Sequence, residues 1–209
     1  MKEFLDVVRA NWKGPRGEEL RRAALASPYW GDGTPEPIEL MGWFMQQANK
    51  ATEGKDNGFG DTYRYAVYTY REFMYWGKNT RATPDGRRDG DQLAQGFSPS
   101  ESRCEEGVTT VMNSIGKLPH DKLYASNVNL TFDASAMNAQ LLAAILRVFC
   151  EKGSHMIQPN CNSAELLLEA QKHPELHRNL IVRVCGFSAR FTSLSKRWQD
   201  EVIARHRLK

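Results

Sequence analysis

One glycine near the C-terminus lies in a sequence that could support radical chemistry. The apolar run Ile181–Val184 is followed by Cys185, Gly186 and Phe187, and this pattern predicts a buried strand entering a sharp loop with Gly186 at its tip. Glycine has no Cβ, so its backbone can adopt unusual angles and approach a partner closely. Loss of a Cα hydrogen also leaves a planar radical, delocalised between the amide nitrogen and the adjacent carbonyl. The simpler alternative is a strand that ends in a turn glycine.

The cysteines are the other side chains with reactive potential. Cys150, His155 and Cys161 are close in sequence, but their spacing matches no structural zinc motif and lacks a fourth ligand. We interpret them as two buried thiols and a strand histidine, and we assign no residue to a metal or a bound cofactor. Cys185 is interpreted as a small buried residue without a catalytic role. The absence of CxxC pairs favours reduced thiols and a cytoplasmic location.

The first third of the chain is predicted to be mainly helical. Apolar residues recur at helical spacing over 2–26, with a break at Gly14-Pro15, and again from about Glu36. Residues 63–73 then alternate between aromatic and polar side chains, which predicts a strand. A platform for single-stranded nucleic acid is the alternative for this stretch, but the modest charge favours a half-buried strand.

The remainder alternates between strands and helices. We predict a strand over 127–132, a helix that begins at Asp133 or Ser135 and ends at Gly153, and a strand over 155–161. A helix from Ser163 to Gln171 then leads to the strand before Gly186. This order predicts an α/β architecture with buried strands.

The overall composition excludes several classes of function. With 209 residues, 41% hydrophobic and 25% charged, the chain can form a globular core. Its formal net charge of +3 does not indicate nucleic acid as a partner. No apolar run is long enough to span a bilayer, so no membrane association is expected.

Several separated segments carry a family resemblance. They are Thr83-Pro84-Asp85-Gly86-Arg87-Arg88-Asp89-Gly90, then Gly96-Phe97-Ser98-Pro99 and Lys117-Leu118-Pro119, then the stretch from His155 to Cys161, the stretch from Arg183 to Ala189, and the tail from Leu194 with Gln199 and Arg205. In this order they resemble the C-terminal portion of the pyruvate formate-lyase-like family of glycyl radical enzymes. The combination is far more specific than any single segment.

The resemblance implies a fold and a chemistry. The fold would be the C-terminal part of a ten-stranded α/β barrel, with residues 1–75 as its helical N-terminal part and 76–209 as the glycyl radical domain. Gly186 would store the radical, which an iron–sulfur activating enzyme installs with S-adenosylmethionine. In the family this radical passes to a cysteine, whose thiyl attacks a small-molecule substrate in acyltransferase, dehydratase or lyase reactions.

One part of the family pattern is missing. The family's thiyl cysteine precedes the Thr-Pro-Asp-Gly turn, whereas Cys104 follows it and only the opening helices lie upstream. The resemblance therefore implies that another chain carries the thiyl cysteine. Two alternatives stay open: a spare radical domain that repairs an oxygen-cleaved enzyme, and a catalytically inactive fragment that acts as a binding module.

Overall fold

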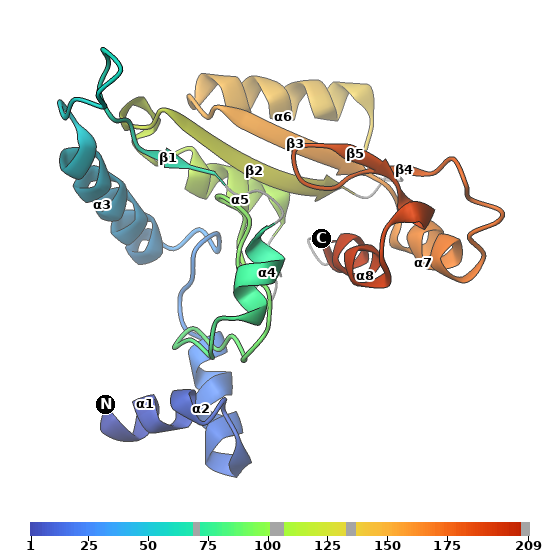
Figure 1. Cartoon of the computed structure of the whole chain (residues 1–209), viewed down its shortest axis with the longest axis horizontal. Helices are drawn as coiled ribbons and strands as arrows, with labels where there is room; N and C mark the ends of the chain where they lie inside the picture. Colours follow the sequence, from blue (N-terminus) through green and yellow to red (C-terminus); the bar gives the residue numbers. More distant parts are fainter. Residues whose placement is uncertain (69–71, 101–106, 133–136, 206–209) are drawn as a thin grey trace.

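The protein is built around a small parallel sheet. The computed structural model describes residues 1–68, 72–100, 107–132 and 137–205. The sheet has the order β1 (Ala66–Val67), β2 (Ala125–Phe132) and β3 (Met156–Cys161), and a separate antiparallel hairpin consists of β4 (Ile181–Arg183) and β5 (Ser188–Arg190). Helix α6 (Ala139–Glu151) connects β2 to β3 and covers one face of the sheet (Figure 1). The α/β architecture predicted from the sequence is confirmed.

The two faces of the sheet differ in chemistry. Val128, Leu130 and Phe132 of β2 belong to an apolar core together with residues of α5 (Val108–Ile115) and α6. The alternate positions of β2 are polar and equally buried, and Asn129 pairs in register with Gln158 of β3. Because successive side chains of a strand point to opposite faces, the polar residues share one face. We call this the amide face; its members are Asn127, Asn129, Gln158 and Asn160.

A second core forms around the hairpin. Val182 and Val184 pack with Phe191, with Phe73 of α4 (Glu72–Lys78) and with Leu167 of α7 (Ala164–Lys172). The last helix, α8 (Lys196–Ala204), adds Val202 to this core. Two short 3-10 turns, η2 (His120–Lys122) and η3 (Phe191–Ser193), complete the C-terminal part. The hairpin therefore has its own apolar support, separate from the core of the sheet.

Two N-terminal helices lie apart from the sheet. Helices α1 (Lys2–Arg9) and α2 (Gly14–Leu25) extend away from it, whereas α3 (Pro35–Thr52) runs beside β1 (Figure 1). The predicted break position is wrong by a few residues: Asn11 and Trp12, with φ of 58° and 59°, separate the helices. Gly14-Pro15 instead begins α2, because proline fits the first turn of a helix, where its missing N–H has no helical partner.

Two other sequence predictions need correction. The strand predicted over 63–73 shrinks to β1, residues 69–71 lie outside the described residues, and α4 begins at Glu72. Phe73, Met74 and Gly77 of that helix are buried together. Their spacing is helical, and it continues beyond residue 73, where the predicted strand was expected to end.

Helix α6 is capped by Asn138, whose side chain accepts the N–H of Leu141 at 2.8 Å. The caps that the sequence suggested, Asp133 and Ser135, lie outside the described residues.

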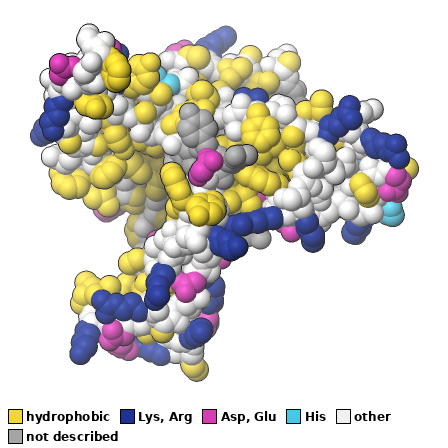
Figure 2. Space-filling view, viewed as in Figure 1, with side chains coloured by type: hydrophobic (Ala, Val, Ile, Leu, Met, Phe, Trp, Pro, Cys, Tyr) yellow, Lys and Arg dark blue, Asp and Glu magenta, His cyan; other side chains and the backbone are white. Residues whose placement is uncertain are grey.

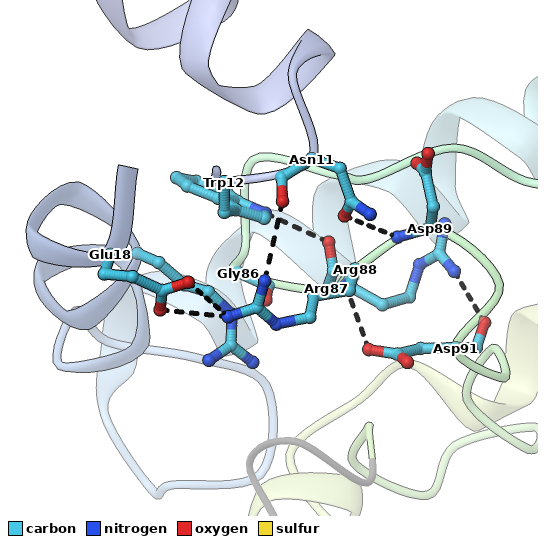
Figure 3. Close-up of polar contacts among 9 residues, drawn as sticks. Asn11, Trp12, Glu18, Gly86, Arg87, Arg88, Asp89 and Asp91 are labelled. Carbon is cyan, nitrogen blue, oxygen red and sulfur yellow. Dashed lines mark hydrogen bonds and ion pairs between the residues drawn. The ribbon is translucent and has the colours of Figure 1, made fainter. Parts of the chain in front are cut away.

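The Thr83-Pro84-Asp85-Gly86 turn anchors the N-terminal helices (Figure 3). The indole N–H of Trp12 donates to the carbonyl of Arg87 at 3.1 Å, and Arg88 forms a double contact with Glu18 at 2.7 and 2.9 Å. The side chain of Asn11 accepts the N–H of Asp89 at 2.9 Å. These contacts hold the two left-handed residues between α1 and α2, so the turn and the N-terminal helices form one unit.

Two glycines beside this turn provide a matched test. Gly86 (φ +97°) and Gly90 (φ +82°) both have left-handed backbones, but a Cβ on Gly86 would lie 2.8 Å from Leu25 of α2, whereas one on Gly90 meets no atom of the described residues within 4 Å. We expect Gly90→Ala to cost about 1 kcal/mol of unfolding free energy from its backbone alone. Gly86→Ala should cost about 1–3 kcal/mol more, because Leu25 must move. Urea unfolding followed by tryptophan fluorescence measures both; equal losses would contradict the close packing of the turn on α2.

Candidate functional site

Gly186 occupies the turn of the β4–β5 hairpin. The strands pair from Ile181 with Arg190 to Arg183 with Ser188, and the N–H of Val184 donates to the carbonyl of Phe187 at 2.9 Å. Cys185 and Gly186 are the two central residues of this turn. Gly186 has a φ of +76°, the conformation that favours glycine at the third position of a tight turn. The structure thus places the candidate residue at the tip of a loop, where the sequence predicted it.

Crowding does not explain the glycine. Among the described residues, a Cβ built on Gly186 would approach the hydroxyl oxygen of Tyr68 alone, at 3.8 Å, which is ordinary contact. Gly186 and Phe187 are both exposed in this chain. The backbone conformation, rather than lack of space, is therefore what requires glycine at this turn.

Two amide side chains of β3 hold the backbone of the hairpin. The N–H of Gly186 donates to Oε1 of Gln158 at 2.9 Å, and the N–H of Arg183 donates to Oδ1 of Asn160 at 2.9 Å. Both acceptors belong to the amide face, and their residues are only 3% and 5% exposed. Both residues lie in the stretch from His155 to Cys161 that carries part of the family resemblance, which implies no role for them. Their alternation in a strand was the available signal, because it places both on one face.

A buried ion pair holds the same hairpin from the other side. Arg205 and Glu201 of the C-terminal helix contact each other through two bonds of 2.8 and 2.6 Å, and Arg205 also donates to the carbonyl of Arg183 at 3.1 Å. Glu201 accepts from Nε2 of Gln95 at 2.6 Å, and Gln95 in turn accepts from Asn129 of the amide face. This chain of polar contacts links the C-terminal helix, the hairpin and the sheet.

The tail glutamine has a local role. Nε2 of Gln199 donates to the backbone carbonyls of Phe191 and Leu194, at 3.2 and 3.1 Å. It thereby satisfies the carbonyls of the short turn η3 between β5 and α8. Gln199 and Arg205, the two tail residues quoted for the resemblance, both support the hairpin from the C-terminal side.

The cysteines differ from the sequence interpretation in one respect. Cys150 and Cys161 are exposed, not buried as predicted: Cys150 lies on the outer side of α6, and Cys161 ends β3 on the face opposite the amides. Cys185 is buried, and burial raises the pKa of its thiol, which disfavours the nucleophilic thiolate. Cys104 lies outside the described residues. Within the part of the chain that the structure describes, no three His, Cys, Asp or Glu side chains gather as they would around a metal ion.

The fold and the turn define a class of protein. The family described as "Glycine radical" matches residues 93–192, which include the hairpin. The chain belongs to the glycyl radical enzyme family and represents its C-terminal portion. Proteins of this family carry a post-translational glycyl radical.

Known proteins extend this likeness over nearly the whole chain. The hydroxyproline dehydratase of Clostridioides difficile, solved with trans-4-hydroxy-L-proline bound, matches 98% of the chain at a TM-score of 0.88 and 29% identity. The B12-independent glycerol dehydratase of Clostridium butyricum matches with a TM-score of 0.86 and 31% identity. "Probable dehydratase YbiW" of Escherichia coli (strain K12) is 43% identical over 137 residues, 62% of this chain and 17% of that protein. The chain spans about a quarter of either dehydratase structure, 26% in both cases.

The buried ion pair can be tested against an exposed pair of the same spacing. Arg205 and Glu201 are almost fully buried at their side chains, whereas Lys196 and Asp200, four residues apart on the same helix, are largely exposed. Arg205→Met should cost about 3–5 kcal/mol of unfolding free energy, because it leaves the Glu201 carboxylate buried without its partner. Lys196→Met should leave the stability almost unchanged. Urea titration of both variants measures the difference. Similar small losses would show that the buried pair does not anchor the hairpin.

Proposed function

We propose that Gly186 stores the radical of this chain. The observation that carries the proposal is a left-handed glycine at an exposed hairpin turn, inside the segment that matches the glycine radical family. An activating enzyme of the radical S-adenosylmethionine class would remove one Cα hydrogen atom and leave the unpaired electron on Gly186. An exposed turn suits this step, because the Cα must come within reach of a second protein.

The chain's own residues would hold the radical in place. Gln158 and Asn160 fix the backbone from the sheet, and Arg205 fixes it from the C-terminal helix. The neighbouring thiol of Cys185 is buried and neutral. We retain the division into a helical part, residues 1–75, and a glycyl radical domain, residues 76–209, as part of this proposal.

The reaction would need a second polypeptide portion with the thiyl cysteine. Thiyl chemistry of the dehydratase, lyase or acyltransferase type on a small molecule then follows from the family. The chain spans about a quarter of the length of its relatives. Its surface exposes apolar side chains on which the missing polypeptide portion could dock. Leu40, Trp43 and Phe44 of α3 are 66%, 57% and 52% exposed, and hydrophobic side chains gather over this helix (Figure 2).

The same helix borders a large groove. Its volume is about 880 Å³, and it lies between α3 and the floor formed by Tyr65, Val67 and Gly96. Exposed apolar patches of this kind usually mark interaction sites. Among the described residues the sheet also ends at β1, and an edge strand presents backbone groups with which another strand can pair. We propose that the cysteine-bearing portion covers both the groove and this edge.

The radical assignment predicts a spectroscopic signal. Anaerobic incubation with an activating enzyme, S-adenosylmethionine and a reductant should give an organic radical in electron paramagnetic resonance. Gly186→Ala should abolish the signal, and Cys185→Ser should keep it, because that thiol has no part in storage. Brief exposure to air should cleave the chain at Gly186, which mass spectrometry of the C-terminal peptide detects. A signal that persists in Gly186→Ala would refute the assignment.

The partner proposal predicts that activity and stability depend on a second chain. The activated chain alone should not turn over any substrate, and addition of a polypeptide with the missing portion should restore turnover and raise the melting temperature by mass action. Trp43→Glu should weaken this association, whereas Phe59→Glu, at a loop residue that is 94% exposed and outside the groove, should not. Sedimentation and thermal melts measure both effects. Restoration of an oxygen-cleaved homologue, without any turnover with the missing portion, would favour the repair alternative.

A further inference from the structure

The hairpin is attached to the sheet by side chains instead of a strand ladder. Strands β4 and β5 form a sheet of their own, separate from β1, β2 and β3. The described hydrogen bonds from β3 to the backbone of β4 and its turn come from the amides of Asn160 and Gln158. A ladder would fix the whole strand, whereas two amides fix two chosen peptide groups. One of these groups is the N–H of Gly186.

We propose that Gln158 is a positioning residue that orients the Gly186 amide and tunes the electron density of its nitrogen. This inference rests on the proposed function, because it concerns the residue that would carry the radical. The radical is delocalised onto the amide nitrogen, so a strong acceptor at the N–H increases the donation from that nitrogen to Cα. Gln158 would therefore act on the stability of the radical as well as on the shape of the turn.

The surroundings of Gln158 suit this role. Its side chain is buried, its Nε2 lies 3.6 Å from the sulfur of Met156, and its register partner on β2 is Asn129. The N–H of Gly186 donates to Oε1 of Gln158, and Nε2 of Gln158 faces the thioether of Met156. These two contacts together define the orientation of the Gln158 side-chain amide. A hydrogen bond in such a site is stronger than one in water, because the local dielectric constant is low.

The second amide serves as an internal comparison. Asn160 lies two residues along the same face and is equally buried, but it accepts from Arg183, three residues before the glycine. Loss of Asn160 should loosen β4 without removing the acceptor at Gly186. A purely structural effect on the radical should therefore appear in variants of both residues. An electronic effect should appear in variants of Gln158 alone.

The first experiment needs no radical. In the full-length, unactivated chain, nuclear magnetic resonance measures the hydrogen exchange rate of the Gly186 amide. Gln158→Met keeps the length of the side chain and removes the acceptor, and it should speed exchange about threefold to tenfold. Gln158→Glu retains an acceptor oxygen and should preserve the protection. Gln171→Met, a matched change at an exposed glutamine of α7 that bonds to Asp200, should have no effect. Unchanged exchange in Gln158→Met would overturn the proposal, whether or not a radical can be installed.

The second experiment tests the electronic effect. In activated chain labelled with ¹⁵N-glycine, Gln158→Met should change the nitrogen hyperfine coupling and shorten the lifetime of the radical, whereas Asn160→Ala should keep the wild-type coupling. Faster exchange with an unchanged coupling would overturn the tuning role and leave only an anchor. If the wild-type chain forms no radical but the hydrogen exchange results are as expected, the proposed radical storage is refuted. The role of Gln158 in positioning the Gly186 amide would then still be supported.

Discussion

Buried amides on one face of a small sheet hold the Gly186 hairpin in place. Gln158 and Asn160 bind the hairpin directly, and Asn129 reaches it through Gln95, Glu201 and Arg205. Unpaired, each of these buried groups would destabilise the fold by about 1–3 kcal/mol. Paired, they connect three segments that lie far apart in the sequence. A purely apolar face would pack the hairpin without defining which peptide groups meet the sheet.

The elements that could be predicted from the sequence depend on local signals. The strand over 127–132 follows from the alternation of Val128 and Leu130 with polar residues, and Ser163 caps α7 by accepting the N–H of Leu166. The position of Gly186 in a turn follows from the apolar run before it. The misassigned stretch 63–73 shows the limit of alternation as a signal. Its aromatic residues alternate over the whole segment, whereas among the described residues it is Ala66–Val67 that pair with β2. Strand pairing depends on the partner strand, which alternation does not report.

The contacts of the amide face could not be predicted, because they join residues that lie far apart in the sequence. Gln95 and Glu201 are 106 positions apart, and their bond becomes visible only when the C-terminal helix is docked. The exposure of Cys150 and Cys161 has a similar origin, since burial depends on what covers each face of α6 and β3. The resemblance supplied residues such as Gln199 and Arg205 without their contacts. Their roles emerge from the carbonyls they satisfy, in η3 and in β4.

The two cores explain how a chain that spans a quarter of its relatives can present the hairpin in a defined geometry. The core around Val182, Val184 and Phe191 is fully buried within this chain, and the ion pair of Arg205 with Glu201 closes it. In contrast, α3 and α6 expose apolar residues on their outer sides, including Trp43 and Leu141. The contacts that shape the glycine turn are therefore internal to the chain. These internal contacts would hold the turn in shape before the proposed second polypeptide portion binds.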